Sequence, residues 1–397
     1  MVNDSVVMFL QEWLTNPDKE DFKGRTFRIH ITHNDLDGYG CIIVTDVIRH
    51  HLSQDKKLFH DVPIIERAVS NPGEVPEILL STITSLTKID GYIPGTDRLK
   101  VLVTDLAPDP SVFKRLILNG HLLDFCVIDH HEGHYAYDLE ALKDDVLYKN
   151  GSYYIHKTTC ATNLVFDICV LAVILGDGGV LSPWCKQLMD FAKAVNRFDL
   201  GNWGSWNCGN ISDVPVEVQE QLIFNRARRD EKVMTWLANR VKAIDRGEPF
   251  VLQHQDLANE EWSDLVTSMN LFLSQMQNWT VQEAPLFSVQ MDGMNRVFNG
   301  PVYQVRGLLV EKDEPSLQNY SLISRQILED HPDIDMLVYI DRNRNTVELR
   351  SRKNECVDVS RVAYVNGGGG HRNAAGFPLP EFTAWNPPIA FGQFNEG

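Results

Sequence analysis

The sequence predicts an α/β fold with an N-terminal parallel-sheet domain, a helical connector and a smaller C-terminal α/β domain. Short apolar or β-branched runs alternate with helix-length stretches through the first half of the chain, which is typical of a parallel sheet. Residues 215–280 are polar and have helical periodicity with little strand signal. From Pro285 onward, strand-like runs return around one helical segment, which indicates a mixed or antiparallel sheet.

Each expected element rests on its own local pattern. In the first half, apolar runs bounded by turn residues predict four strands: Thr26–Thr32, Val62–Val69, Leu99–Thr104 and Leu122–Ile128. Helical periodicity then predicts two helices, at Thr159–Leu175 and Pro183–Val195. In the last third, a helix near Leu317–Asp330 lies among four strands: Leu286–Met291, Val302–Leu309, Met336–Asp341 and Thr346–Ser351. The expected domains are 1–214, 215–280 and 281–397, and residues 1–24 have no assigned role.

Composition and charge narrow the function classes. The 397 residues are 43% hydrophobic and 23% charged, the balance of a soluble globular protein. Asp plus Glu number 54 against 37 Lys plus Arg, so the net charge is −17. A broad basic face for duplex nucleic acid is therefore not expected. Short anionic substrates remain open, provided that metal ions reverse the sign of the charge locally.

Cysteine use and hydropathy favour a cytoplasmic protein without a membrane partner. The seven cysteines are scattered and form no C-x-x-C pair, which is typical of a reduced intracellular protein. The N-terminus lacks the basic start and apolar core of a signal peptide. The longest apolar run, Val170–Leu175, is too short to span a bilayer.

Acidic and imidazole side chains follow three of the expected strands. In chain order they are His33, Asp35, Asp37, Asp105, Asp129, His130 and His131. Because ligands bind at the carboxyl ends of strands in open α/β sheets, we expect these side chains to lie together. Each motif alone also fits a turn or a helix cap, since Asp-Gly is common turn chemistry. The joint pattern favours a site.

The donor types indicate which chemistry such a site would perform. Carboxylates and imidazoles without thiolates suit Mn²⁺, Mg²⁺, Fe²⁺ or Zn²⁺. The number of donors exceeds what one ion needs. Two ions about 3.5–4 Å apart can activate a water and stabilise the leaving oxygen of a phosphoryl displacement. The residues therefore predict a two-metal hydrolase.

At these residues the sequence resembles the DHH superfamily of phosphoesterases, whose third motif stands here as Asp129-His130-His131. His33-x-Asp35-x-Asp37-Gly38 resembles the first motif, Asp105 the second and Asp199 the fourth. Gly367–His371, followed by Ala374-Ala375-Gly376, resembles the signature of the DHH-associated C-terminal domain, which Arg350-Ser351 precedes. Cys41 and Cys160-Ala161-Thr162-Asn163 depart from the family pattern, where Ser and Glu are usual, and leave the subfamily in doubt.

The resemblance implies a role for each matched residue. His33, Asp35 and Asp105 would hold one manganese ion, and Asp37, Asp105, His130 and Asp199 the other, with Asp105 bridging. Asp129 would support the metal motif, and His131 would lie near the scissile phosphate. A water or hydroxide shared by both ions would attack phosphorus. The substrate contacts would come from the C-terminal domain: Arg350, Ser351, Gly368, Gly369, Gly370 and His371.

The glycine run also has a physical rationale. Consecutive glycines let the backbone approach a phosphate and turn its N–H groups inward as an anion nest. Taken alone, the run also fits a flexible loop. With the metal motifs upstream, we expect the nest.

Within the superfamily, the sequence is most similar to the nanoRNase branch, which releases mononucleotides from very short oligoribonucleotides. We therefore expect a manganese-dependent exoribonuclease that acts on short RNA oligonucleotides or on cyclic or bisphosphate nucleotides. The sequence leaves open whether the chain forms a homodimer. A cyclic (di)nucleotide phosphodiesterase using the same site is the alternative. A third hypothesis is a non-catalytic sponge that sequesters nucleotides.

Overall fold

The computed structural model describes residues 4–15, 22–55, 64–69, 72–131, 146–156, 158–177, 183–200, 216–227, 230–246, 250, 252, 255–275, 277–282, 286–291, 294–299, 304–312, 320–352, 358–365 and 368–379. The chain divides into two compact units. Unit 1 comprises Met1–His131, Tyr135–Gly204 and Val216–His254. The described residues of unit 2 are those from Gln255 onward.

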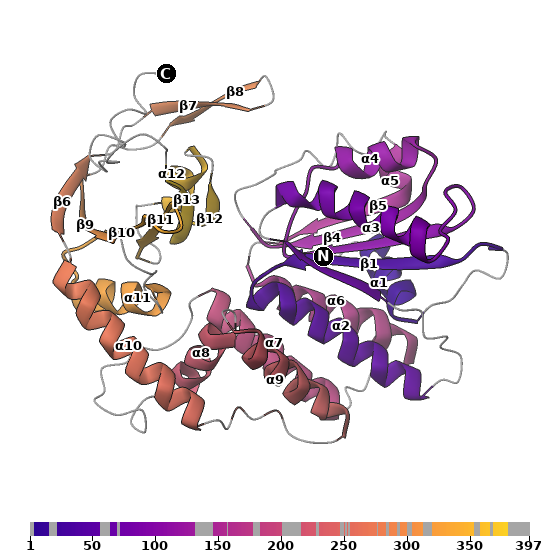
Figure 1. Ribbon diagram of the computed structural model, residues 1–397, viewed down its shortest axis with the longest axis horizontal. Coiled ribbons are helices and arrows are strands. Elements are labelled where there is room, and N and C mark those ends of the chain that lie inside the picture. The colour runs from indigo at the N-terminus through magenta and orange to yellow at the C-terminus, as the bar shows by residue number, and fades with distance from the viewer. Residues whose placement is uncertain are drawn as a thin grey trace. The chain divides into compact units, whose positions relative to one another are not determined.

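Unit 1 is built on a five-stranded sheet (Figure 1). Its strands are β1 (Thr26–His33), β2 (Ile64–Val69), β3 (Arg98–Thr104), β4 (Leu122–Asp129) and β5 (Gly151–Ile155). They lie in the order β2-β1-β3-β4-β5, and every neighbouring pair is parallel. The predicted α/β class with a parallel sheet is therefore confirmed, and β5 is the strand that the sequence patterns missed.

Helices cover both faces of this sheet and give three layers (Figure 1). One face carries α1 (Asp4–Thr15), α2 (Leu36–Asp55) and α6 (Ala161–Asp177). The other carries α3 (Val75–Ile89), α4 (Ser111–Leu118) and α5 (Val146–Asn150). The remaining helices of unit 1 pack against the first helical layer: α7 (Pro183–Asp199), α8 (Val216–Ala227) and α9 (Glu231–Lys242). Short 3₁₀ turns occupy Pro72–Glu74 and Ala243–Arg246.

Side-chain alternation along the strands divides the apolar residues of unit 1 between two cores. In β3, Val101 and Val103 point into the core beneath α3 and α4, whereas Leu102 points into the core beneath α1, α2 and α6. The N-terminal segment, which the sequence left without a role, completes the second core. Trp13 of α1 is fully buried there, and Glu12 pairs with the buried ammonium of Lys100 at 2.6 Å.

Unit 2 contains a mixed sheet with the strand order β12-β13-β11-β10-β9-β6. The strands are β6 (Gln277–Gln282), β9 (Gln304–Lys312), β10 (Met336–Asp341), β11 (Thr346–Ser351), β12 (Gly369–His371) and β13 (Ala374–Pro378). Only β9 and β10 pair in parallel among these described strands. The other elements are α10 (Gln255–Gln275), α11 (Tyr320–Asp330), α12 (Val359–Val365) and the hairpin of β7 (Leu286–Met291) and β8 (Met294–Asn299).

The helical stretch expected at 215–280 is distributed between the units. Helices α8 and α9 group with unit 1, while α10 groups with unit 2. The reason for the first assignment is apolar packing, because Phe224, Leu237 and Val241 join the core that contains α2 and α7. Among the described helices, we find none that combines the length and apolar character needed to cross a membrane.

The strand order fixes where a ligand can bind in unit 1. The chain first adds β2 on one side of β1 and then β3 on the other, so the carboxyl ends of β1 and β3 flank a topological switch point. Ligands of open α/β sheets bind at such a point. The acidic and histidine motifs follow β1, β3 and β4, which are neighbours at this edge.

Candidate metal centre

The structure brings together the unit 1 residues that the sequence singled out. His33 ends β1, and Asp37 lies in the first turn of α2. Asp105 directly follows β3, and His130 directly follows β4. Asp199 is the last residue of α7, which runs one turn beyond the predicted end at Val195. We call His33 and Asp35 the outer group, and Asp37, His130 and Asp199 the inner group.

Asp105 lies between the two groups and has an unusual backbone. Its φ angle is +60°, in the left-handed region that side chains other than Gly rarely adopt. Its N–H donates to the carbonyl of Ile128 at 2.8 Å, which joins the ends of β3 and β4. Such outliers persist where the surrounding structure fixes them, and they cluster at functional sites. The turn directs a fully buried carboxylate into the centre.

The outer group faces one oxygen of Asp105. Nδ1 of His33 lies 2.8 Å from Oδ2 of Asp35 and 3.7 Å from Oδ2 of Asp105. The other oxygen of Asp35, Oδ1, accepts the N–H of Gly38 at 3.0 Å in the first turn of α2. Asp35 therefore caps a helix with one oxygen and leaves the other for the centre.

The inner group faces the other oxygen of Asp105. Nε2 of His130 lies 3.1 Å from Oδ1 of Asp105 and 3.3 Å from Oδ2 of Asp37. The same nitrogen lies 3.6 Å from Oδ2 of Asp199. Three carboxylates, one after β3 and the others from α2 and α7, thus converge on one imidazole nitrogen.

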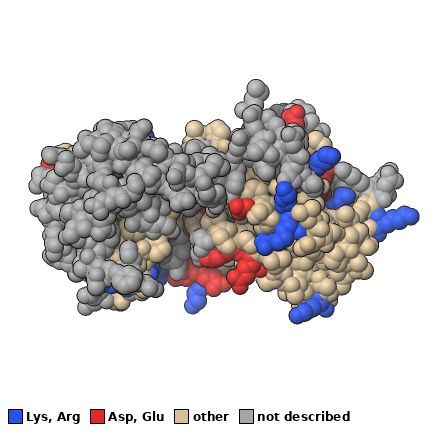
Figure 2. Space-filling view, turned by 90° about the horizontal axis from the view of Figure 1, so that it is seen from above, with Lys and Arg blue, Asp and Glu red and all other residues tan. Residues whose placement is uncertain are grey.

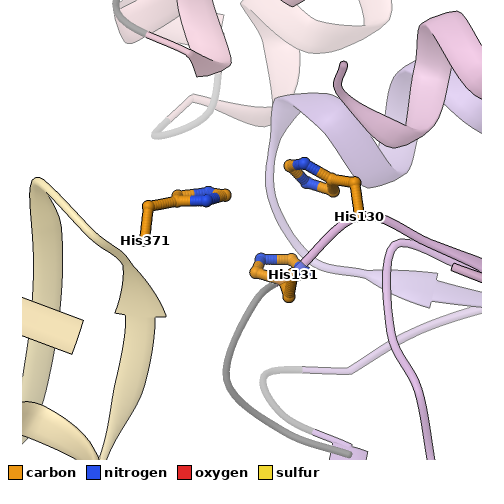
Figure 3. Close-up of side chains that lie close together, drawn as sticks. All are labelled: His130, His131 and His371. Carbon is orange, nitrogen blue, oxygen red and sulfur yellow. The ribbon is translucent and has the colours of Figure 1, made fainter. Parts of the chain in front are cut away.

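Asp129 orients the histidine pair that follows β4. Its Oδ1 accepts the backbone N–H of His130 at 2.8 Å and lies 2.8 Å from Nδ1 of His131. This bond holds the His131 ring and leaves its Nε2 as the available nitrogen. Figure 3 shows both rings projecting from the residues after β4, whereas the third labelled side chain, His371, belongs to β12 of unit 2.

Two parts of the centre's support were missed by the sequence analysis. The first is the N-terminus of α6, where the N–H groups of Ala161 and Thr162 donate to the two oxygens of Asp37 at 2.7 and 2.8 Å. The Thr162 hydroxyl also donates to the Asp37 carbonyl at 2.6 Å. Gly40 is required here, because a Cβ would collide with the Thr162 hydroxyl. The Asp-Gly-x-Gly spacing of Asp37–Gly40, at the start of α2, was the available signal.

The second is a row of buried polar side chains below the centre. Nε2 of His30 lies 2.9 Å from the Thr104 hydroxyl, which donates to the Thr32 hydroxyl at 2.9 Å. The Thr32 hydroxyl donates in turn to the Thr104 carbonyl at 3.1 Å. Burial lowers the pKa of His30 to about 3, so this ring is neutral. The row ties β1 to β3 immediately before His33 and Asp105, and polar residues inside an apolar strand were its sequence signal.

The pKa shifts show how poorly the centre tolerates its own negative charge. Burial and the charge of Asp105 raise the pKa of Asp37 to about 6. Burial raises the pKa of Asp199 to about 7, although His130 opposes the shift. Burial alone would lower the pKa of His33, but Asp105 and Asp35 raise it to about 11. Without a cation, Asp37 and Asp199 therefore hold their protons to a higher pH than ordinary carboxyl groups, and the imidazole of His33 stays protonated beside Asp35 and Asp105.

The residues present fit divalent cations. Both oxygens of Asp105 are buried, and within the described part of the chain neither has a hydrogen bond of acceptable geometry. A buried carboxylate in that state is costly unless a cation compensates it. Single donor atoms of His33, Asp35 and Asp105 lie close enough to hold one ion, and so do those of Asp37, Asp105 and His130. Oxygen and nitrogen donors of this kind suit Mn²⁺, Mg²⁺, Fe²⁺ or Zn²⁺.

In unit 2, Arg350 and His371 lie on the same face of the sheet. Arg350 of β11 pairs with Ala374 of β13, which pairs with His371 of β12, and laterally paired residues share a face. Nη2 of Arg350 donates to the Ser321 hydroxyl at 2.9 Å, and the guanidinium stacks 5.1 Å from the Tyr320 ring centroid. The guanidinium is therefore held in place before any ligand binds.

Ser351 and the glycine run make contacts within unit 2. Ser351 is buried on the opposite face, where its hydroxyl accepts the amide N–H of Asn373. Gly368 donates its N–H to the Ala363 carbonyl at 2.8 Å, and Gly369 and Gly370 form part of the strand β12. These glycines meet a steric need, because a Cβ at Gly368 would collide with the Gly376 carbonyl. Within the glycine run, Gly369 and Gly370 thus form part of the edge strand β12, and Gly367 lies outside the described residues.

The distribution of Lys and Arg on the surface can be compared with the expectation that the chain has no broad basic face for duplex nucleic acid. On the face shown in Figure 2, the described Lys and Arg side chains stand at several separate places and do not merge into one basic track. This distribution agrees with the net charge of −17.

Comparisons with known proteins give distant structural similarities. Neither a protein-family model nor a curated protein sequence matches the chain. An uncharacterized protein from Helicobacter pylori G27 is 17% identical, with a TM-score of 0.32 and coverage of 94% of this chain and 100% of that one. A pGpG-specific phosphodiesterase from Vibrio cholerae is 14% identical, with a TM-score of 0.39 and coverage of 89% and 94%.

RecJ from Thermus thermophilus, solved in complex with Mn²⁺, is 15% identical with a TM-score of 0.46. The match covers 98% of this chain and 53% of RecJ, so the chain spans about half the length of that protein. At these identities and TM-scores, the similarities assign neither a family nor a substrate to this chain.

Proposed function

We propose that this chain is a two-metal phosphodiesterase of the DHH type that hydrolyses short oligoribonucleotides to mononucleotides. The observation that carries the proposal is the position of Asp105. One of its oxygens faces the outer group and the other faces the inner group. A carboxylate shared in this way would suit a pair of ions about 3.5–4 Å apart. The DHH-like motifs in the sequence supply the residues that form the two groups, in the same order along the chain.

The side chains around the centre have separable tasks in this reaction. When bound, two divalent ions would supply Lewis-acid activation of water and charge stabilisation at the phosphate. His33, Asp35, Asp37, His130 and Asp199 would hold these ions, with Asp105 between them. Asp129 holds the His131 ring through Nδ1, so Nε2 of His131 can donate a hydrogen bond to a phosphate oxygen. No side chain is needed as a nucleophile.

We propose short substrates because of the negative net charge of the chain and because Arg350 can bind a phosphate. A chain with a net charge of −17 is poorly suited to a long polyanion, whereas a short oligonucleotide has few phosphates to neutralise. Arg350 is held by Tyr320, Ser321 and the Glu348 carboxylate, and its remaining N–H donors can bind a terminal phosphate. His371 shares its sheet face. We propose Mn²⁺ as the working ion, because it is one of the ions that these donors suit and the DHH-like motifs imply manganese.

The test is product analysis by chromatography in the presence of Mn²⁺. The substrates are RNA from two to about twenty-four nucleotides, pGpG, cyclic dinucleotides, cyclic mononucleotides and adenosine bisphosphate. We expect fast release of mononucleotides from the shortest RNAs and slow attack on the longest. Asp105→Asn is the inactive control. Preference for the cyclic compounds would replace the proposal with a cyclic-nucleotide phosphodiesterase, and tight binding without turnover would replace it with a nucleotide sponge.

A further inference from the structure

Asn196 of α7 directs its side chain toward the segment that precedes α6. Its Oδ1 accepts the Thr159 hydroxyl at 2.8 Å and the backbone N–H of Cys160 at 2.7 Å. Two donors therefore converge on one amide oxygen, across a sequence separation of 36 and 37 residues. Asn is a poor helix former, so this tertiary contact, not helix propensity, accounts for the residue.

The segment that Asn196 holds leads directly to Asp37. Cys160 precedes the first turn of α6, where the N–H groups of Ala161 and Thr162 donate to the Asp37 carboxylate at 2.7 and 2.8 Å. The connection from the amide oxygen of Asn196 to Asp37 thus runs through consecutive backbone groups. Any movement of the segment before α6 would move the two N–H groups that fix this carboxylate.

The helix that carries Asn196 also carries Asp199. The two residues are three apart, so they lie on neighbouring positions of the same helix face. Asp37 and Asp199 are the two carboxylates that face His130 from α2 and α7, at 3.3 and 3.6 Å. Asn196 is therefore bonded to the support of one carboxylate and lies on the same helix as the other. These contacts do not connect Asn196 to either residue of the outer group.

We propose that Asn196 is a positioning residue that sets the separation of Asp37 and Asp199, and with it the affinity of the inner ion. This inference rests on the two-ion centre of the proposed function. Partners that support metal ligands typically contribute about 10–100-fold to metal affinity. Loss of the Asn196 oxygen should weaken the inner ion within that range and leave the outer ion within about twofold of wild type.

The experiment is a calorimetric titration of the metal-free full-length chain with Mn²⁺. Wild type is compared with Asn196→Ala, Asn196→Asp, Thr159→Val and Asn163→Ala. Asn196→Asp keeps an acceptor oxygen and should restore both binding events. Thr159→Val removes one of the two donors and should give an intermediate weakening. Asn163 bonds to Asp167 on the exposed side of α6, so Asn163→Ala should match wild type. The binding event that Asp37→Asn weakens identifies the inner ion.

Three results would overturn the inference: unchanged binding in Asn196→Ala, equal weakening of both ions together with a lower unfolding temperature, or an Asn196→Asp variant as defective as Asn196→Ala. If Asn196→Ala does not fold, Thr159→Val decides, because selective weakening supports the inference and no change overturns it. Failure of wild type to bind Mn²⁺ would overturn this inference and the proposed function together. Two bound ions without hydrolysis would overturn the proposed function alone.

Discussion

The outer and inner groups are built from the same residue types but differ in solvent access. The side chains of His33 and Asp35 are 25% and 28% exposed, whereas in the inner group those of His130 and Asp37 are each 1% exposed and that of Asp199 is 17% exposed. Water can therefore replace a lost ligand in the outer group more easily than it can replace Asp37 or His130 in the inner group. The comparison teaches that two ions bridged by Asp105 need not be equivalent. We expect the inner ion to bind more tightly and exchange more slowly.

The largest effect is expected where the two groups meet. Asp105→Asn removes the charge shared by both groups, so we expect turnover to fall by about 10³-fold or more, beyond the loss of a single transition-state hydrogen bond. Asn is the suitable replacement because it tolerates the left-handed backbone of this residue. Initial rates on a dinucleotide measure the effect. Asp109→Asn is the control, since the Asp109 carboxylate accepts the backbone N–H of Ser111 at the start of α4, outside the centre. Retained turnover in Asp105→Asn would exclude a bridging role.

Two single substitutions, one in each group, test directly whether the inner ion binds more tightly than the outer ion. Asp37→Asn must turn its amide N–H₂ toward the N–H groups of α6 or toward His130, and no water can take its place. Asp35 is 28% exposed, so water can take the place of the oxygen that Asp35→Asn alters. Changing a ligand should cost no less than the roughly 10–100-fold typical of a partner that supports one. We therefore expect Mn²⁺ affinity to fall by at least about 100-fold for one event in Asp37→Asn and by at least about 10-fold for the other event in Asp35→Asn. Equal losses in calorimetric titrations would break the distinction.

His131 separates ion binding from chemistry. Its Nδ1 is bonded to Asp129, so we expect His131→Gln to keep both Mn²⁺ affinities while kcat falls by about 10²-fold, the lower range for a group that assists proton transfer or hydrogen bonding at the reacting atoms. Asp129→Asn should change kcat in the same direction, because it releases the ring. Loss of a bound ion in His131→Gln would instead make His131 a ligand.

The sequence predicted the donors of both groups but not how they are held. Parallel strands bring their carboxyl ends to one edge, so His33, Asp105 and His130 could be placed together from strand positions alone. The φ angle of Asp105 depends on how β3 and β4 are joined, and the bonds from α6 to Asp37 connect residues more than 100 positions apart. In unit 2, the conformation of the glycine run was set by pairing with β13, which local composition does not reveal.

The smallest effect is expected in thermal stability and its pH dependence. The native pKa values of Asp37 and Asp199, about 6 and about 7, lie above the usual value of 3.8. Their contribution to stability is therefore complete below about pH 3.8 and is lost as pH rises through the native values. The metal-free chain should lose stability as the pH rises from about 3.8 to about 7. Mn²⁺ should restore more of that stability at higher pH, because cations and protons compete for the same oxygens.

At a free Mn²⁺ concentration 100 times the Kd, binding stabilises the native state by about 3 kcal/mol. For a unit of this size that corresponds to a rise in Tm of roughly 5–10 °C, measurable by calorimetry near pH 7.5 and smaller near pH 5. Asp105→Asn should show little rise at either pH. A rise that is the same at both values would mean that the ion displaces no protons from the inner group, and the exposed outer group would then be the tighter site.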